Sequence, residues 1–167
     1  FTEAFAAGRT IIAPDWRGFG GSTVSEVLHF FDRVITPYAP RTLVFYSGDN
    51  DIARGATPEA VIADYQELIR RVEEALPATT LILQGIKPSI ARLALWPKMQ
   101  EVNEALRKLA GDKERVEFID TAPTLLDADG MPKRELLKED GLHLNEAGYA
   151  LWTPLVRAAL EKAHDLP

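Results

Sequence analysis

Four short apolar runs, rich in β-branched or large residues, alternate along this chain with longer stretches of mixed polarity. The runs cover residues 10–13, 42–46, 81–83 and 116–119, a length typical of strands. In the stretches between them, apolar residues recur at helical spacing. Strands that alternate with helices in this way predict a three-layer α/β/α domain, in which a parallel sheet is covered on both faces and carries its sites at the carboxyl ends of the strands.

The predicted helix at 58–76 is the best delimited of these elements. Thr57 is placed to cap its N-terminus, Pro58 suits the first helical position, and Pro77 ends it. Helical spacing also runs through residues 24–34, and a third helix is expected at 97–109.

A last helix is expected after Asn145, which is a plausible N-cap. Pro154 lies inside this segment and lacks the amide that a continuous helix needs. We therefore expect a kink at Pro154, or a restart of the helix with Thr153 as its cap.

The composition is that of one globular domain. The chain has 167 residues, of which 46% are hydrophobic, so it can bury one core and is short for two ordinary domains. It contains no internal repeat, low-complexity tract or linker. We expect residues 1–167 to form a single domain.

Charge and cysteine content exclude several classes of partner. The formal net charge is −6 and the basic residues form no cluster, which argues against binding to nucleic acid or to an anionic membrane. No apolar run approaches the roughly 20 residues of a membrane span. Without cysteine there is no thiolate nucleophile and no cysteine-based zinc site. We expect a soluble protein, cytoplasmic or exported, with a small-molecule substrate; the oligomeric state stays open.

A candidate acid–base pair lies near the C-terminus, where Asp140 precedes His143 by three residues. An imidazole can take a proton from a hydroxyl nucleophile while a carboxylate binds the other ring nitrogen, which fixes the tautomer and stabilises the imidazolium. The alternative is a surface turn without a catalytic role. The other histidines, His29 and His164, lie within helical patterns and have no acid in a comparable turn.

Two further turns, both upstream, come directly after predicted strands. The glycine run at 18–21 opens a helix, so its backbone amides can point at developing negative charge. Asn50 comes after the next strand, and its side-chain amide can donate to an oxyanion. Each segment can equally be a plain tight turn, because glycine and asparagine favour turns.

Together, three blocks resemble the GDSL or SGNH hydrolase superfamily, and its bacterial members in particular, in their order and spacing: Gly18-Phe19-Gly20-Gly21-Ser22-Thr23, Gly48-Asp49-Asn50-Asp51 and Asp140-Gly141-Leu142-His143. The resemblance implies a flavodoxin-like parallel sheet with strand order 2-1-3-4-5. It also implies that Gly21, through its amide, and Asn50, through its side chain, are the oxyanion donors. His143 would be the base, and Asp140 the acid that orients it.

The serine block of that superfamily is missing from this sequence. The resemblance places the nucleophilic serine, and the first strand that carries it, just ahead of Phe1. That strand lies inside the sheet, so its absence would leave the strands at 10–13 and 42–46 without their shared neighbour. We expect preceding residues, or a strand from elsewhere, to fill the slot. Ser22 and Ser47 lie beside the oxyanion blocks and are poor substitutes for the nucleophile.

Two tryptophans are candidates for a substrate pocket. Trp16, ahead of the glycine turn, could narrow a substrate channel. Trp96 lies beyond the loop after the strand at 81–83 and could line an acyl or alcohol pocket, or simply pack against the adjacent helix.

The leading hypothesis is a serine esterase that hydrolyses small carboxylic esters through an acyl-enzyme, without a metal or an organic cofactor. One alternative is a non-enzymatic phosphate or flavin binder. Gly18, Gly20 and Thr23 loosely match a phosphate-cradling turn, although the Lys-Ser/Thr pair of a P-loop is missing. Another is a hydrolase-like domain without activity. The fold and the triad leave the acyl chain and the alcohol undetermined.

Overall fold

A parallel three-stranded sheet is the centre of the protein, seen here in a computed structural model that describes residues 20–164. The strands β1 (Thr42–Phe45), β2 (Thr80–Gln84) and β3 (Val116–Ile119) lie in the order β1-β2-β3. In register, Val44 pairs with Ile82, and Ile82 with Glu117. These strands confirm three of the predicted runs. The run at 10–13 lies outside the described residues.

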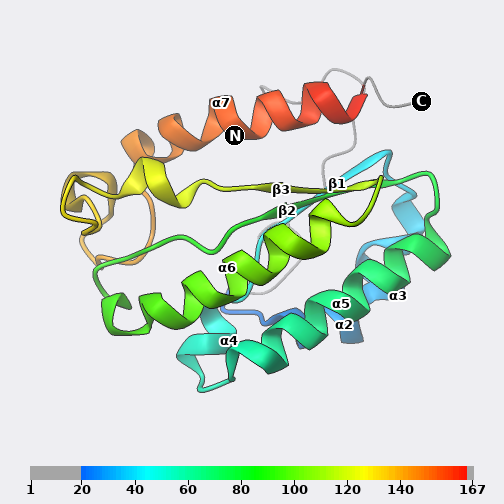
Figure 1. The fold of residues 1–167 in the computed structure, drawn as a ribbon, viewed down its shortest axis with the longest axis horizontal. Helices are drawn as coiled ribbons and strands as arrows, with labels where there is room; N and C mark the ends of the chain where they lie inside the picture. The colour runs from blue at the N-terminus through cyan, green and yellow to red at the C-terminus, as the bar shows by residue number, and fades with distance from the viewer. Residues whose placement is uncertain (1–19, 165–167) are drawn as a thin grey trace.

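Helices cover both faces of this sheet, as the α/β/α prediction requires (Figure 1). The helix α7 (Glu146–His164) lies along one face, and α5 (Pro58–Ala75) and α6 (Trp96–Gly111) lie along the other. The short helix α2 (Val24–His29) packs beside α5. None of the helices within residues 20–164 has the length and hydropathy that a membrane span requires.

Alternate residues of the same strands serve the two faces. Leu43 and Leu83 join the large core formed with α2, α5 and α6, whereas Val44 and Ile82 pack against residues of α7. Successive side chains of a strand point to opposite faces, so a strand covered by helices on both sides needs apolar residues at every position. This explains why the runs are mainly apolar; Glu117 in β3 is an exception.

The predicted helical stretch at 24–34 is divided in two. The helix α2 ends at His29 and α3 (Phe31–Val34) comes next, because Phe30 leaves the helical conformation, with φ −100° and ψ 8°. Thr23 and Glu26 form a capping box at the start of α2, in which each side chain accepts a hydrogen bond from the other residue's backbone N–H.

Two of the predicted N-caps are confirmed. The Thr57 hydroxyl accepts the Ala60 N–H at 3.3 Å at the start of α5. The Asn145 side-chain oxygen accepts the Gly148 N–H at 3.1 Å at the start of α7. Both bonds satisfy amides that have no partner within the helix.

The helix α7 continues through Pro154, so the predicted restart at Thr153 is wrong. The Thr153 hydroxyl does not cap a new helix; it donates to the carbonyl of Tyr149, one turn earlier, at 2.8 Å. A threonine inside a helix commonly makes this bond to the preceding turn. Packing of α7 on the sheet keeps the helix in one piece although Pro154 provides no N–H.

The remaining elements are short and lie at the ends of the strands or helices. They are α4 (Asp49–Ala53) and the 3₁₀ turns η2 (Thr36–Tyr38), η3 (Leu93–Leu95), η4 (Ala122–Leu125) and η5 (Arg134–Leu136). Of these, α4 lies directly after β1 and carries the Asn50 block, and η3 ends the loop after β2.

Candidate active site

Asp140 and His143 form a hydrogen-bonded pair in the loop ahead of α7. His143 Nδ1 lies 2.7 Å from Asp140 Oδ2. The other carboxylate oxygen accepts the backbone N–H groups of Leu142, at 2.8 Å, and His143, at 2.9 Å. A carboxylate can only accept, so the ring proton belongs on Nδ1 and the lone pair of Nε2 is left to take a proton.

These hydrogen bonds hold Asp140 in its charged form. The His143 side chain, together with the backbone amides of His143 and Leu142, lowers the pKa of the Asp140 carboxyl well below its ordinary value. The side chains of His143 and Asp140 are 64% and 46% exposed, so the imidazole is accessible from solvent. The pair has the arrangement that a general base needs.

The loop that carries the pair is closed by its own backbone. The Lys138 N–H donates to the His143 carbonyl at 2.7 Å, and the Arg134 guanidinium donates to the carbonyls of Lys138 and Glu139. Gly141 adopts a left-handed conformation, with φ +64°, which a side chain would strain. The geometry of the pair is therefore built into a defined turn.

The loop after β2 ties the acid–base turn to the sheet. The ammonium of the buried Lys87 donates to the Leu142 carbonyl at 2.6 Å, and the Ala91 N–H donates to the Gly141 carbonyl at 3.1 Å. A Cβ on Gly141 would lie 3.5 Å from the Cβ of Ile90. The turn therefore rests on the carboxyl end of β2.

Asn50 lies on α4, after the left-handed Gly48, and its side-chain amide is held at both ends. Its Nδ2 donates to the Ser22 carbonyl at 3.1 Å, and its Oδ1 accepts from Arg92 Nη2 at 3.0 Å. An amide nitrogen carries two N–H groups. Among the described residues, Ser22 engages one of them, so the second N–H remains available as a donor.

The glycine turn is joined to the Asn50 block by backbone as well as side-chain contacts. Gly21 has φ +86°, and the next residue, Ser22, provides the carbonyl that binds Asn50. One residue beyond Thr23, the Val24 N–H donates to the buried Asp51 at 2.9 Å. The positive φ of Gly21 changes the direction of the backbone between the end of the turn and the start of α2.

The structure thus brings the three predicted blocks to one edge of the sheet. The glycine turn contacts Asn50, Asn50 contacts Arg92, and the loop that contains Arg92 contacts the Asp140–His143 turn. These segments lie just after β1 and β2, or pack against the segments that do. Carboxyl ends of parallel strands meet at one edge, which is why residues distant in sequence converge there.

The remaining candidates are the two tryptophans and the two serines considered as substitutes for the nucleophile. Trp96 begins α6 and is 8% exposed, packed in the main core. Ser47 is buried and its carbonyl accepts the Tyr65 hydroxyl at 2.9 Å, whereas Ser22 contributes its carbonyl to Asn50. Trp16 and the start of the glycine run lie outside the described residues.

Three residues at this edge were missed by the sequence analysis: Lys87, Arg92 and Asn103. Asn103 on α6 is buried, accepts the Ile86 N–H at 2.7 Å and donates to the Ile86 carbonyl at 2.9 Å. The signal that could have found Lys87 and Arg92 is their position, since both are polar residues shortly after a buried strand. For Asn103 no such signal exists, because it lies in the middle of a helical pattern.

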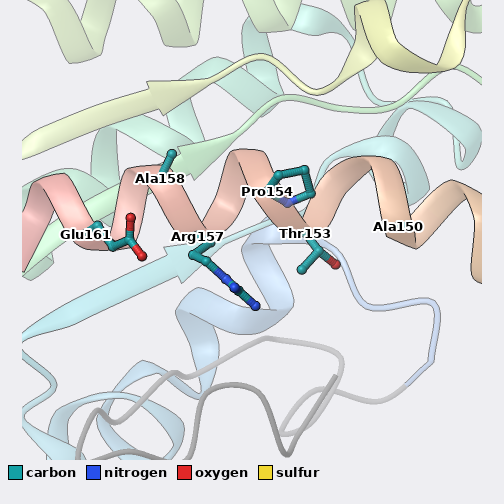
Figure 2. Close-up of a pocket in the computed structure, with 6 residues that line it drawn as sticks. All are labelled: Ala150, Thr153, Pro154, Arg157, Ala158 and Glu161. Carbon is teal, nitrogen blue, oxygen red and sulfur yellow. The ribbon is translucent and has the colours of Figure 1, made fainter.

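A hollow elsewhere on the molecule does not involve these residues (Figure 2). It runs along α7 and is lined by Ala150, Thr153, Pro154, Arg157, Ala158 and Glu161, none of which is a predicted site residue. Within residues 20–164, no group of three or more histidine or carboxylate side chains is arranged to hold a metal ion.

Residues 2–151 match the model of the GDSL-like lipase/acylhydrolase family, a span that includes all three blocks. The chain belongs to this family. Its membership accounts for the fold, since solved structures of GDSL-like lipases share the three-layer architecture. One from Bacteroides thetaiotaomicron has a TM-score of 0.75 and 19% identity, covering 86% of this chain and 73% of that one. A carbohydrate esterase family 3 protein from Talaromyces cellulolyticus has a TM-score of 0.73 and 18% identity, covering 88% and 70%.

Curated relatives of this chain include proteins named as mammalian acetylhydrolases. The platelet-activating factor acetylhydrolase IB subunit alpha1 of Bos taurus is 28% identical over 143 residues, and so is that of Homo sapiens. The match covers 84% of this chain and 59% of those proteins, so the chain spans about three-fifths of their length. The family is thus one of lipases and acylhydrolases, and the structural neighbours share its fold.

Proposed function

We propose that this GDSL-family chain provides the base and the oxyanion donors of a serine esterase for small carboxylic esters. His143 acts as base and then acid, Asp140 orients it, and Gly21 and Asn50 bind the oxyanion. The nucleophile in this proposal is the serine of the family's first block, which is not among the three blocks of this sequence. The observation that carries the proposal is the convergence of the Asp140–His143 pair and the Asn50 amide on one sheet edge, through the loop after β2.

In the first half of the reaction, the serine hydroxyl oxygen attacks the ester carbonyl carbon and its proton passes to His143 Nε2. The carbonyl electron pair moves onto oxygen, where the Gly21 N–H and the free Asn50 N–H stabilise the negative charge. Collapse of this intermediate breaks the bond to the alcohol oxygen, which takes the proton from the imidazolium. The acyl group is left on the serine.

In the second half, water replaces the alcohol. His143 takes a proton from the water as its oxygen attacks the acyl carbon, and returns a proton to the serine oxygen as the carboxylic acid leaves. Asp140 stabilises the imidazolium in both halves. Its lowered pKa supports this role, because the carboxylate stays charged over the whole range in which an ester is hydrolysed near neutral pH.

A short acyl group, of which acetyl is the simplest, is the substrate class that we favour. Curated relatives over most of this chain are named acetylhydrolases, and one solved structure of the same fold is an acetyl esterase variant with an acetate ion. The formal net charge of −6 disfavours a polyanionic alcohol.

No observation favours the phosphate-binding or flavin-binding alternative. Three backbone donors at the start of α2 are already used. Asp51 accepts the Val24 N–H, Thr23 accepts the Glu26 N–H, and Glu26 accepts the Thr23 N–H. Two carboxylates at this helix end would repel a phosphate group, which needs free N–H donors and positive potential.

The decisive experiment measures turnover of p-nitrophenyl acetate by the full-length protein. His143→Ala is expected to abolish turnover above the background reaction, because the serine then has no base. His29→Ala, an exposed histidine at the end of α2, is the matched control and should keep wild-type activity. Unchanged turnover in His143→Ala would remove His143 from the mechanism. A wild-type protein without esterase activity would favour the inert domain.

A further inference from the structure

We propose that Arg92 is a positioning residue for the oxyanion site: its guanidinium holds the Asn50 amide so that an N–H, and not the carbonyl oxygen, faces the substrate. The inference rests on the proposed function of Asn50 and deepens it. Arg92 lies in the loop after β2, just before η3, and belongs to none of the three sequence blocks.

The hydrogen bonds around Asn50 determine which way its amide points. Arg92 Nη2 lies 3.0 Å from Asn50 Oδ1, and a guanidinium can only donate, so that side-chain atom must be the oxygen. On the opposite side, the Ser22 carbonyl can only accept, so the atom 3.1 Å from it must be the nitrogen. If the amide were flipped, its NH₂ group would face the guanidinium of Arg92 and its oxygen would face the Ser22 carbonyl. Both hydrogen bonds would then be lost.

Arg92 is itself held in place by Asp49, the residue that precedes Asn50. Arg92 Nη1 lies 2.9 Å from Asp49 Oδ2, an ion-pair distance, although Nη1 has no aligned hydrogen-bond acceptor within residues 20–164. The two side chains are only 18% and 12% exposed, so solvent screens their attraction weakly. The guanidinium therefore bridges two consecutive residues at the start of α4.

This arrangement has two consequences for catalysis. The amide of Asn50 is prepared before substrate binds, so no free energy is spent on orienting it in the transition state. The charge-assisted bond to Oδ1 also draws electron density from the amide, which strengthens its N–H groups as donors. Both effects act on the transition state, where the oxygen carries its charge, and hardly on substrate binding. Arg92 should therefore affect kcat and leave KM nearly unchanged.

A double-mutant cycle on p-nitrophenyl acetate hydrolysis by the full-length protein tests the inference. Arg92→Met keeps the length of the side chain and removes its donors, and we expect kcat to fall about 10-fold, the equivalent of one lost charge-assisted bond. Arg92→Lys keeps the charge and should recover part of this loss. The control is Arg70→Met, which removes an exposed ion-paired arginine on α5 and should leave kcat unchanged.

The combination with Asn50→Ala gives the decisive result. Asn50→Ala alone should lower kcat by about 10²–10³-fold, as does the loss of one oxyanion donor elsewhere. Because Arg92 acts through Asn50, adding Arg92→Met to Asn50→Ala should lower kcat by less than a further threefold. A full 10-fold loss in the Asn50→Ala background, or an effect mainly on KM, would overturn the role of Arg92 and leave the esterase proposal standing.

Two further outcomes are distinguishable from these. If Asn50→Ala itself changes kcat by less than threefold, Asn50 is not an oxyanion donor, and the proposed function of that residue fails together with the inference. If Arg92→Met does not fold, as judged by its thermal transition, the same cycle is run with Arg92→Lys. A loss of kcat that disappears in the Asn50→Ala background supports the inference, and an equal loss in both backgrounds overturns it.

Discussion

At the scale of single residues, the Asp140 carboxylate carries the most specific set of contacts. One oxygen binds the imidazole and the other binds two backbone amides, so the same side chain shapes the turn and orients the base. Three residues of separation are enough for this because all the contacts are local. That is why the pair could be predicted from sequence.

Asp140→Asn separates the two roles of this side chain. The amide oxygen can still accept the backbone N–H groups, so the turn should persist. The amide nitrogen would face Nδ1, favouring the wrong tautomer and leaving the imidazolium without its counter-charge. We expect kcat for p-nitrophenyl acetate to fall on the order of 10³–10⁴-fold with little change in thermal stability. A loss of less than tenfold would show that Asp140 shapes the turn only.

At Asp51 burial has a larger effect on the pKa than hydrogen bonding, the reverse of the situation at Asp140. The side chain is buried, and a charge there is unfavourable. Desolvation raises the pKa of this carboxyl, outweighing the backbone hydrogen bonds from Val24 and Asp51 that lower it. An acid with a raised pKa in the folded state binds its proton more tightly there than when unfolded. The free energy of unfolding should therefore decline as pH rises from the ordinary value through the raised one, and stay lower above it.

The substitution Asp51→Asn should remove this pH dependence and stabilise the protein at neutral pH. The side-chain oxygen of Asn can still accept the Val24 N–H. Asp51→Ala leaves that N–H without an acceptor and should lower the free energy of unfolding by about 1–3 kcal/mol. Urea unfolding of the three proteins between pH 4 and 8 measures both effects. A wild-type free energy of unfolding that rises over this range in parallel with that of Asp51→Asn would contradict the assignment.

At the scale of elements, α7 packs closely against the segment at η5. The acid–base turn lies between these two elements, so this contact determines its position. Gly148 in the first turns of α7 leaves room for this contact. A Cβ there would lie 2.5 Å from the Leu136 carbonyl oxygen and 3.0 Å from Leu144 Cδ2. A backbone oxygen cannot swing away as a side chain can, so only glycine allows this packing.

Two glycine-to-alanine substitutions in helices should therefore have opposite signs. Gly148→Ala is expected to destabilise by about 1–3 kcal/mol through overpacking. Gly111→Ala, at the end of α6 where an added Cβ meets nothing within 4 Å, should stabilise by up to about 1 kcal/mol through helix propensity. Thermal unfolding of the two variants measures this difference. Equal shifts of the thermal midpoint in the two variants would mean that α7 moves to make room for the added Cβ at position 148.

Element boundaries were predicted well where local chemistry decides them. Thr57 and Asn145 cap their helices as expected, because a cap needs only a side chain and an amide two or three residues on. The break at Phe30 was not predicted, and the restart at Thr153, one of two outcomes expected at Pro154, does not occur. Both depend on how the helices pack on their neighbours, which outweighs local preference.

At the scale of the whole molecule, the loop after β2 links the two halves of the candidate site, and α6 holds that loop. Asn103 satisfies both backbone groups of Ile86, which is fully buried between β2 and the loop. Lys87, Ala91 and Arg92 then reach the acid–base turn and Asn50 from the same loop.

Asn103→Leu should therefore reduce both stability and activity. It leaves the buried N–H and carbonyl of Ile86 without partners, at about 1–3 kcal/mol for each group. It also frees the loop that carries Arg92, so kcat should fall along with the thermal midpoint. The control is Glu104→Ala on the exposed side of the same helix, which should change stability by no more than about 0.5 kcal/mol. A folded Asn103→Leu variant with full activity would show that the loop is held by its other contacts.

By itself, the sequence determined the strands at 42–46, 81–83 and 116–119, the caps and the Asp140–His143 pair, because mainly apolar runs, caps and turns depend on residues close together in the chain. Only the tertiary structure decided that Arg92 reaches Asn50 across 42 positions, that Lys87 reaches Leu142 across 55, and that Asn103 clamps Ile86. Such contacts depend on how loops leave the sheet edge and on which helix covers them, and no local pattern of polarity specifies either.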